Sequence, residues 1–260
     1  MTYETITLDI AENIATITLN RPERLNAMPP QMADEISDAL DNLDGARALL
    51  ITGEGRAFCS GADLQARGGA AALGASGPYG ALTRAYNPTM IKLSRLNVPI
   101  ITAVNGPAAG IGCSLALCSD FAIAGKSAYF LQAFVNIGLV PDGGASWMLP
   151  RLIGKARATQ MMLLGEKISG DQAAEWGLIY KCVDDSDLMA EAHALAARLA
   201  NGPSLAIGIM RQNIATALEM DYASALLREA EGQRIAGASA DAMEGGLSFL
   251  QKRKPVFTGK

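Results

Sequence analysis

The amino-acid sequence predicts an α/β protein whose C-terminal region is helical. Short apolar segments that suit buried strands alternate with segments of helical spacing over about the first 185 residues. The strand-like segments then stop, and the last third of the chain carries only apolar stripes of helical period. Half of the 260 residues are apolar and 18% are charged, which suffices for a large core in a globular protein.

The N-terminal elements follow from simple periods of apolar side chains. Residues 3–10 and 13–19 alternate apolar and polar side chains and therefore predict a hairpin. Residues 30–43 predict a helix, because their apolar side chains recur at helical spacing. Residues 48–51 form a short, continuous apolar run, which is typical of a buried strand.

The middle of the chain repeats the alternation of strand and helix. Residues 65–80 are rich in Gly and Ala without a period, and they predict a mobile loop or a marginal helix. Residues 81–96 predict a helix, and residues 99–104 predict a second buried strand. Residues 111–118 predict an apolar helix, and residues 120–124 the strand that follows it.

The C-terminal part divides from the rest at a break in residues 201–203 (Asn-Gly-Pro), which predict a hinge. We therefore expect a core of residues 1–200 and a helical region of residues 201–260. Three apolar stripes of helical period lie around and beyond the break, and they need cover from the core or from a neighbouring subunit: Leu188, Ala192, Leu195, Leu199; Ile207, Met210, Ile214; and Met243, Leu247, Leu250.

Composition excludes several classes of protein. The net charge is −4 and no long block of Lys or Arg occurs, so neither nucleic acid nor an anionic membrane is expected as a partner. No apolar run reaches the roughly 18 residues of a membrane span, and the first residues do not resemble a signal peptide. The cysteines follow no zinc spacing and are expected to be reduced thiols of a cytoplasmic protein: Cys59, Cys113, Cys118 and Cys182.

Two turns of small residues follow apolar strand-like runs, at residues 59–64 and 110–114. A turn of this kind that opens a helix leaves backbone N–H groups without partners inside the helix. Two such groups aimed at one point can hold a developing negative charge on oxygen, which is the chemistry of an oxyanion hole. The turns therefore predict an anion site built from backbone, and side chains must decide which reaction follows.

Few side chains are available for acid–base chemistry. The single histidine, His193, lies off the apolar stripe of its predicted helix and is expected to be solvated, which disfavours Ser–His and Cys–His mechanisms and leaves no expected metal site. Carboxylates remain. Asp63 fits either a helix-capping acid or a site residue. Asp142 fits either a Pro-Asp-Gly turn or a base with a raised pKa, held in a dry site after the apolar run 130–140.

Signals for phosphate binding are weak. No Walker loop is present, and neither turn has the glycine spacing of a dinucleotide-binding fingerprint. Arg24, the basic run 252–254 and Lys260 fit either solvated charges or contacts to an anionic ligand.

Four motifs resemble the crotonase superfamily of enoyl-CoA hydratases and isomerases. They are residues 20–27 (Asn-Arg-Pro-Glu-Arg-Leu-Asn-Ala), 58–64 (Phe-Cys-Ser-Gly-Ala-Asp-Leu), 105–110 (Asn-Gly-Pro-Ala-Ala-Gly) and 138–144 (Gly-Leu-Val-Pro-Asp-Gly-Gly). The resemblance as a whole covers essentially the whole chain. The resemblance implies a spiral of ββα units in residues 1–200. It also implies that the helical residues 201–260 join subunits into a homotrimer or a dimer of trimers.

The resemblance implies a site as well. The substrate would be an acyl-CoA thioester whose carbonyl oxygen is held by the backbone N–H groups of Ala62 and Ile111. Coenzyme A would arrive as part of the substrate, so no separate cofactor is expected. Contacts to it would come from the first two motifs, the second turn and the C-terminus of a neighbouring subunit: Arg24, Leu25, Ala27, Ser60, Gly61, Asp63, Leu64, Gly112, Phe257 and Lys260.

Departures from the family pattern indicate the reaction. Hydratases of this superfamily carry two catalytic glutamates, where this chain has Ser114 and Phe134, and neither substitute is a general base near neutral pH. Asp142 is left as the carboxylate at a catalytic position of some relatives. Together with residues 86–88 and 255–260, it resembles the ring 1,2-epoxyphenylacetyl-CoA isomerases of bacterial phenylacetate degradation, which are similar to Δ3,Δ2-enoyl-CoA isomerases.

The expected function is therefore an acyl-CoA isomerase in which one aspartate moves a proton through a thioester enolate. Two alternatives stay open, namely an enoyl-CoA hydratase in which Asp142 activates water and a non-catalytic acyl-CoA-binding module. An RNA-binding relative is disfavoured by the negative charge. The acyl pocket is expected between residues 65–80 and the helix of residues 81–96, and either an aromatic ring or a short aliphatic chain would suit it.

Overall fold

The computed structural model describes residues 2–64 and 76–260. Within these residues, six strands form the larger sheet in the order β1-β2-β3-β4-β6-β9, and three short strands form a second sheet in the order β5-β7-β8. The larger sheet is parallel except for the pair β1 and β2. Its strands are β1 (Ile6–Ala11), β2 (Ile14–Leu19), β3 (Ala48–Gly53), β4 (Ile100–Val104), β6 (Phe121–Gly125) and β9 (Lys181–Val183). The second sheet contains β5 (Ala108–Ala109), β7 (Tyr129–Leu131) and β8 (Ile168–Ser169).

The N-terminal hairpin is confirmed. Its two connecting residues, Glu12 and Asn13, both have positive φ angles, of 52° and 63°. This geometry is that of the mirror-image two-residue turns that match the twist of antiparallel strands. The hairpin adds the antiparallel strand β1 at the edge of an otherwise parallel sheet.

The central strands β3 and β4 of the larger sheet are buried on both faces, which explains why they are nearly continuous apolar runs. In β3 every residue is buried, and successive side chains point to opposite faces. Ala48 and Leu50 pack with helix α7 (Leu188–Ala200), while Leu49 and Ile51 pack into the main core on the other side. The apolar stripe of α7 is covered in this way by the sheet itself.

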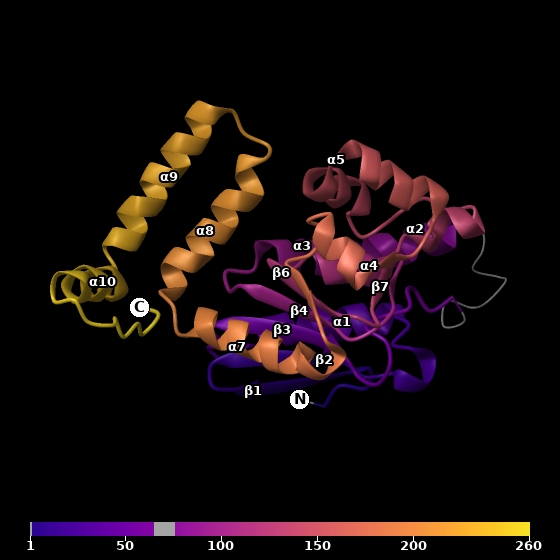
Figure 1. Ribbon diagram of the computed structural model, residues 1–260, viewed down its shortest axis with the longest axis horizontal. Coiled ribbons are helices and arrows are strands. Elements are labelled where there is room, and N and C mark those ends of the chain that lie inside the picture. Colours follow the sequence, from indigo (N-terminus) through magenta and orange to yellow (C-terminus); the bar gives the residue numbers. More distant parts are fainter. Residues whose placement is uncertain (1, 65–75) are drawn as a thin grey trace.

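The remaining helices of the first 200 residues surround the main core (Figure 1). The helix predicted at residues 81–96 is confirmed as a continuous helical segment with one π-helical turn, η3. The predicted helix at 111–118 and the strands at 99–104 and 120–124 are confirmed as α4, β4 and β6. Most of the segment 65–80 lies outside the described residues. The helical elements are α1 (Pro30–Asp41), α2 (Ser76–Ala81), η3 (Leu82–Tyr86), α3 (Asn87–Arg95), α4 (Ile111–Leu117), α5 (Ala145–Leu164) and α6 (Gly170–Glu175).

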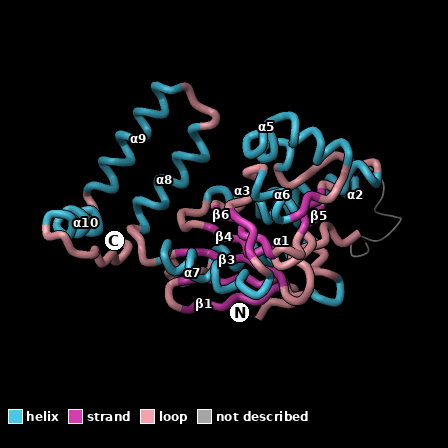
Figure 2. Tube along the Cα trace, viewed as in Figure 1, coloured by secondary structure: helices cyan, strands magenta, loops and turns pink. Residues whose placement is uncertain are grey.

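The C-terminal region forms an arm of three helices, α8 (Ser204–Ala217), α9 (Tyr222–Gly237) and α10 (Ala240–Leu250), that extends away from the sheet (Figures 1 and 2). The helical prediction is confirmed, since no strand follows β9 in the described chain. Two of the apolar stripes are not covered, because Ile214 is 70% exposed on α8 and Met243 is 69% exposed on α10. None of the described helices is long and apolar enough to cross a membrane.

Arg47 ties the arm to the core at the predicted hinge. Its guanidinium donates to the hydroxyl of Ser204 at 2.7 Å, to the carbonyl of Phe257 at 3.3 Å and to the carbonyl of Gly202. One side chain of the core therefore holds both the start of α8 and the C-terminal tail, which fixes the arm at its base.

Candidate functional site

The first small-residue turn is held by a parallel bridge between Met28 and Ala62. The N–H of Met28 donates to the carbonyl of Gly61 at 2.8 Å, and the N–H of Asp63 donates to the carbonyl of Met28 at 2.9 Å. In such a bridge the groups on either side of the central residue make the bonds, so the N–H of Ala62 points away from Met28. In the described part of the chain, the N–H of Ala62 is therefore oriented by the β-bridge to Met28 and not by the start of a helix.

The second turn is a helix start. Gly110 is the N-cap of α4 with a φ of 53°, and Ile111 is the first helical residue. The N–H of Gly110 donates to the carbonyl of Leu131 at 2.9 Å, and the N–H of Ser114 closes the first turn of the helix on Gly110 at 3.1 Å. The N–H of Ile111 belongs to the group of first-turn donors that have no acceptor inside the helix.

The two turns are in contact. Cys59 accepts a backbone hydrogen bond from the N–H of Ala109 at 2.9 Å, which joins the segment before each turn. A Cβ atom on Gly61 would lie 3.2 Å from the carbonyl oxygen of Ala109, and one on Gly110 would lie 3.8 Å from the Cα of Gly61. The positive φ angles therefore favour glycine at Gly61 and Gly110, and the close approach to Ala109 favours it further at Gly61.

Asp142 lies in a turn that packs directly on this helix start. Its carbonyl oxygen accepts a hydrogen bond from the hydroxyl of Ser114 at 2.9 Å, and its Oδ1 atom is buried. The next residue, Gly143, has a φ of 61°, and a Cβ atom there would lie 2.5 Å from Cδ1 of Ile111 and 2.6 Å from Cβ of Ser114. The structure thus brings the predicted base next to one of the two predicted donors.

Phe134 also borders the second turn, but the apolar run around it differs from the prediction. Its ring would lie 3.6 Å from a Cβ atom on Gly110, and the side chain is buried. The apolar run 130–140 was expected to place Asp142 in a dry site at its end. The run divides into β7, a 3-10 helix (Ala133–Ile137) and a loop, and Ile137 and Val140 are 58% and 81% exposed. Phe134 is buried against the second turn, whereas the end of the run next to Asp142 is open.

The structure brings together the two segments that carry the predicted coenzyme A contacts. The N–H of Ser60 donates to the carbonyl of Leu25 at 3.0 Å, and the hydroxyl of Ser60 lies 3.4 Å from the carbonyl of Arg24. Ala27 lies next to this pair of backbone segments, and Leu64, at the end of the second segment, is exposed. Residues 24–27 and 60–64 therefore form one surface beside the first turn.

Two of the predicted contacts, Asp63 and Gly112, have partners inside the protein. Asp63 is buried, and its carboxylate accepts a hydrogen bond from Nη1 of Arg21 at 2.8 Å. The same nitrogen donates to the carbonyl of Ala27 at 2.6 Å. Gly112 packs on Cys59, since a Cβ atom would lie 2.3 Å from the Cys59 carbonyl oxygen. Sequence reasoning missed Arg21, although it stands within the first motif.

Phe257 and Lys260 do not join this surface within one chain. The tail folds back on α10, where the buried carboxylate of Asp241 accepts hydrogen bonds from the N–H groups of Thr258 and Gly259 at 2.7 and 2.8 Å. Figure 1 shows the C-terminus beside α10, at the opposite end of the molecule from α2 and α4. The predicted contact from a neighbouring subunit stays a prediction.

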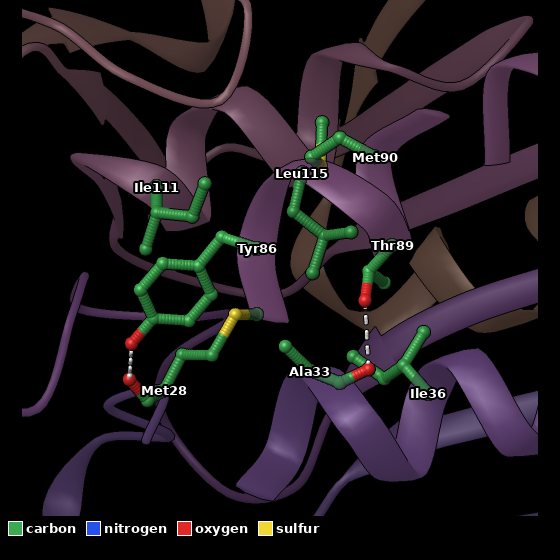
Figure 3. A pocket seen from close by; sticks show the side chains of 8 residues that line it. All are labelled: Met28, Ala33, Ile36, Tyr86, Thr89, Met90, Ile111 and Leu115. Carbon is green, nitrogen blue, oxygen red and sulfur yellow. Dashed lines mark hydrogen bonds between the residues drawn. The ribbon is translucent and has the colours of Figure 1, made fainter. Parts of the chain in front are cut away.

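A small apolar cavity lies on the inner side of the second turn (Figure 3). Tyr86 lines it beside Ile111, and the Tyr86 hydroxyl donates to the carbonyl of Met28 at 2.7 Å. Tyr86 thus links the cavity to the residue that pairs with Ala62. The helix predicted to line the acyl pocket supplies three of the lining residues, which are Met28, Ala33, Ile36, Tyr86, Thr89, Met90, Ile111 and Leu115.

The side chains that could act as nucleophiles near the turns are not activated. Burial raises the pKa of the Cys59 and Cys113 thiols to about 12, so both stay protonated near neutral pH. All four cysteines are free thiols. His193 is exposed on α7, as predicted. Neither the Cys59 thiol nor the Cys113 thiol is therefore a ready nucleophile.

Comparisons with known proteins agree with the motifs. The model of the enoyl-CoA hydratase/isomerase family matches residues 9–260. The 1,2-epoxyphenylacetyl-CoA isomerase of Escherichia coli is 44% identical, and a probable enoyl-CoA hydratase of Rhodobacter capsulatus is 45% identical, each alignment covering at least 99% of both chains. A solved enoyl-CoA hydratase/isomerase structure from Mycobacterium abscessus superposes with a TM-score of 0.91 at 37% identity, over 98% of this chain and 100% of that one. The chain therefore belongs to the enoyl-CoA hydratase/isomerase family of enzymes, with the crotonase fold that its four motifs predicted.

Proposed function

We propose that the protein is an acyl-CoA isomerase that uses Asp142 as its single acid–base group. The observation that carries the proposal is the contact between the Asp142 turn and the start of α4, through Ser114 and Gly143. The two positions at which hydratases of the superfamily carry glutamate hold a serine and a phenylalanine, so Asp142 is the carboxylate available beside the predicted oxyanion donors. The 44% identity to the Escherichia coli isomerase supports the same reaction.

In the proposed mechanism, Asp142 removes a proton from one carbon of the acyl group. The negative charge moves to the thioester oxygen, where the N–H groups of Ala62 and Ile111 stabilise the enolate. Each donor of this kind lowers a reaction barrier by about 2.7–4 kcal/mol. Asp142 then returns the proton two carbons further along, which shifts the double bond and regenerates the carboxylate.

The rest of the substrate would follow the surfaces beside this centre. Coenzyme A would lie along residues 24–27 and 60–64, whose backbones run side by side. The acyl group would extend toward the apolar cavity that Tyr86 and Ile111 line. We further propose that a trimer places Phe257 and Lys260 of a neighbouring subunit near the nucleotide.

The direct test is Asp142→Asn, which keeps the shape of the side chain but removes the base. We expect turnover of a Δ3-enoyl-CoA or of 1,2-epoxyphenylacetyl-CoA to fall by about 100-fold or more. Asp9→Asn, on the exposed edge strand β1, is the matched control and should turn over substrate at the normal rate. Turnover of Asp142→Asn within a few fold of the unaltered enzyme would refute the proposal.

Hydration is the second candidate, because the Rhodobacter capsulatus relative is called a probable enoyl-CoA hydratase. The products formed in deuterated water separate the two reactions. An isomerase yields a thioester with a migrated double bond and no added oxygen. A product with a new hydroxyl group would instead assign Asp142 to the activation of water.

A further inference from the structure

The hydroxyl of Ser114 makes an unusual hydrogen bond for a serine inside a helix. Serines in helices commonly bond back to a carbonyl three or four residues earlier in the same helix. Ser119, next to the C-terminal end of α4, does this with the carbonyl of Ala116 at 2.9 Å. Ser114 is fully buried and donates instead to the carbonyl of Asp142, which is 28 residues away in the sequence. This bond joins the helix of the second turn to the turn that carries the proposed base.

The neighbouring contact is just as specific. Gly143 follows Asp142 with a positive φ angle, and its Cα lies so close to α4 that a Cβ atom would be 2.6 Å from Cβ and 3.1 Å from Oγ of Ser114. Any side chain at position 143 would therefore collide with Ser114, so the turn needs glycine there. The Ser114 hydroxyl and the missing side chain of Gly143 together define how near the Asp142 turn comes to Ile111.

We propose that Ser114 is a positioning residue for the Asp142 carboxylate, and that it does so by fixing the 142–143 turn against the oxyanion helix. The inference rests on the proposed function, in which Asp142 is the base. The position that carries a glutamate in related hydratases is, in this chain, occupied by the anchor of another carboxylate. Because Gly143 lies directly against Ser114, we expect a glutamate at position 114 to displace the turn that carries Asp142.

The consequence for catalysis is a matter of distance. A proton is transferred efficiently only when the base lies within hydrogen-bonding reach of the carbon-bound proton, and displacement of a catalytic group by 1 Å can cost about 100-fold in rate. Without the Ser114 bond, the turn would keep the hydrogen bond from the N–H of Ala145 to the carbonyl of Asp142 at 3.2 Å but would lose this link to α4. The proposed coenzyme A surface lies along residues 24–27 and 60–64, whereas the hydroxyl of Ser114 donates to the carbonyl of Asp142.

The test measures kcat and KM separately for Ser114→Ala, with Ser119→Ala as the matched control. We expect Ser114→Ala to lower kcat for isomerisation by about 10- to 100-fold and to change KM by less than about twofold. In deuterated water, a larger share of its product should carry deuterium, because a misplaced carboxylate returns the proton more slowly and exchanges it first. Ser119→Ala should match the unaltered enzyme in all three measurements.

Two further variants keep the inference falsifiable. Gly143→Ala leaves the hydroxyl intact but forces the turn away, and it should reproduce the loss of kcat. Ser114→Glu should neither isomerise at the normal rate nor hydrate crotonyl-CoA. An unchanged kcat in Ser114→Ala overturns the inference, and so does a change confined to KM. Normal isomerisation by Ser114→Glu overturns it as well.

The outcomes also separate this inference from the proposed function. If Asp142→Asn is inactive while Ser114→Ala is fully active, Asp142 is the base and Ser114 does not position it. If Asp142→Asn retains activity, the proposed function fails and the inference fails with it. Loss of kcat in both variants, with normal binding in Ser114→Ala, supports both.

Discussion

Arg21 joins two segments that are about 40 residues apart in the sequence and carry most of the predicted coenzyme A contacts. Its Nη1 bonds both to the Asp63 carboxylate and to the carbonyl of Ala27. Asn26, fully buried between these segments, accepts from the N–H of Arg21 at 2.9 Å and donates to the carbonyl of Ala57 at 2.8 Å. At the scale of single residues, polar side chains therefore hold the first turn in place without touching the reacting atoms.

We predict that Arg21→Gln lowers the free energy of unfolding by about 2 kcal/mol and raises KM for the acyl-CoA substrate. The physical reason is that the carboxylate of Asp63, only 10% exposed, loses its cationic partner. Urea unfolding and steady-state kinetics measure the two effects. Arg95→Gln, at an exposed position in the last turn of α3, should change neither quantity. A normal unfolding midpoint in Arg21→Gln would show that the pair contributes nothing to stability.

At the scale of elements, Arg211 clamps α8 to the core. Its guanidinium bonds to the carboxylate of Asp120 at 2.7 and 2.9 Å, and it donates to carbonyl groups at the C-terminal end of α3, those of Leu93, Ser94 and Leu96. The last carbonyls of a helix have no partner within it, and cations are favoured at that end. One buried arginine thus links α8 both to Asp120 and to the end of α3.

We predict that Arg211→Met destabilises the protein by about 3 kcal/mol, because it removes the cation beside Asp120 and the donor to the carbonyls of Leu93 and Ser94. Urea unfolding followed by circular dichroism provides the measurement. Arg234→Met, which removes an exposed ion pair within α9, should leave the unfolding midpoint where it is. Equal midpoints for the two variants would contradict the assignment of Arg211 as the clamp.

The elements with a clear period could be predicted from the sequence, and those fixed by distant contacts could not. The hairpin, the buried strands and α7 followed from local patterns alone. In α8 the pattern was misleading, since Gly208 and Arg211 face the core, while the apolar Met210 and Ile214 face outward. Gly208 is required because a Cβ atom there would lie 2.6 Å from the carbonyl oxygen of Asn97, a contact that no local pattern reveals.

The candidate site was likewise predictable from the sequence only in part. Its backbone turns were visible in the sequence, because glycine at tight turns follows from local geometry. The partners of Ser114, Asp63 and Tyr86 were not visible, because each lies between about 28 and 58 residues away and depends on how the sheets pack. The resemblance to a family supplied the positions of the predicted site residues, but not the contacts that hold them.

At the scale of the whole molecule, the arm exposes more large apolar surface than an isolated subunit ordinarily would. Phe249 and Leu250 are 83% and 78% exposed on α10, and Leu227 on α9 is similarly open. Ile137 and Val140, on the core near the Asp142 turn, are exposed as well. Large exposed apolar patches usually mark interfaces between proteins. In the proposed trimer, further copies of the chain would cover these exposed apolar side chains.

We therefore predict that the protein has a mass in solution of three or six times its 27.2 kDa chain, and that Phe249→Glu combined with Leu250→Glu gives a monomer. Burial of a charge without a partner costs far more than an apolar contact returns, so the interface should not form. Light scattering coupled to size-exclusion chromatography measures the mass. Met189→Ser, at a partly exposed position on α7, serves as the control and should assemble normally.

If neighbouring subunits supply Phe257 and Lys260, the monomer should show a raised KM for acyl-CoA with a smaller change in kcat, because the proposed base and both proposed oxyanion donors belong to one chain. A mass of one chain for the unaltered protein would contradict the assembly. An unchanged KM in the monomeric variant would contradict the shared nucleotide site.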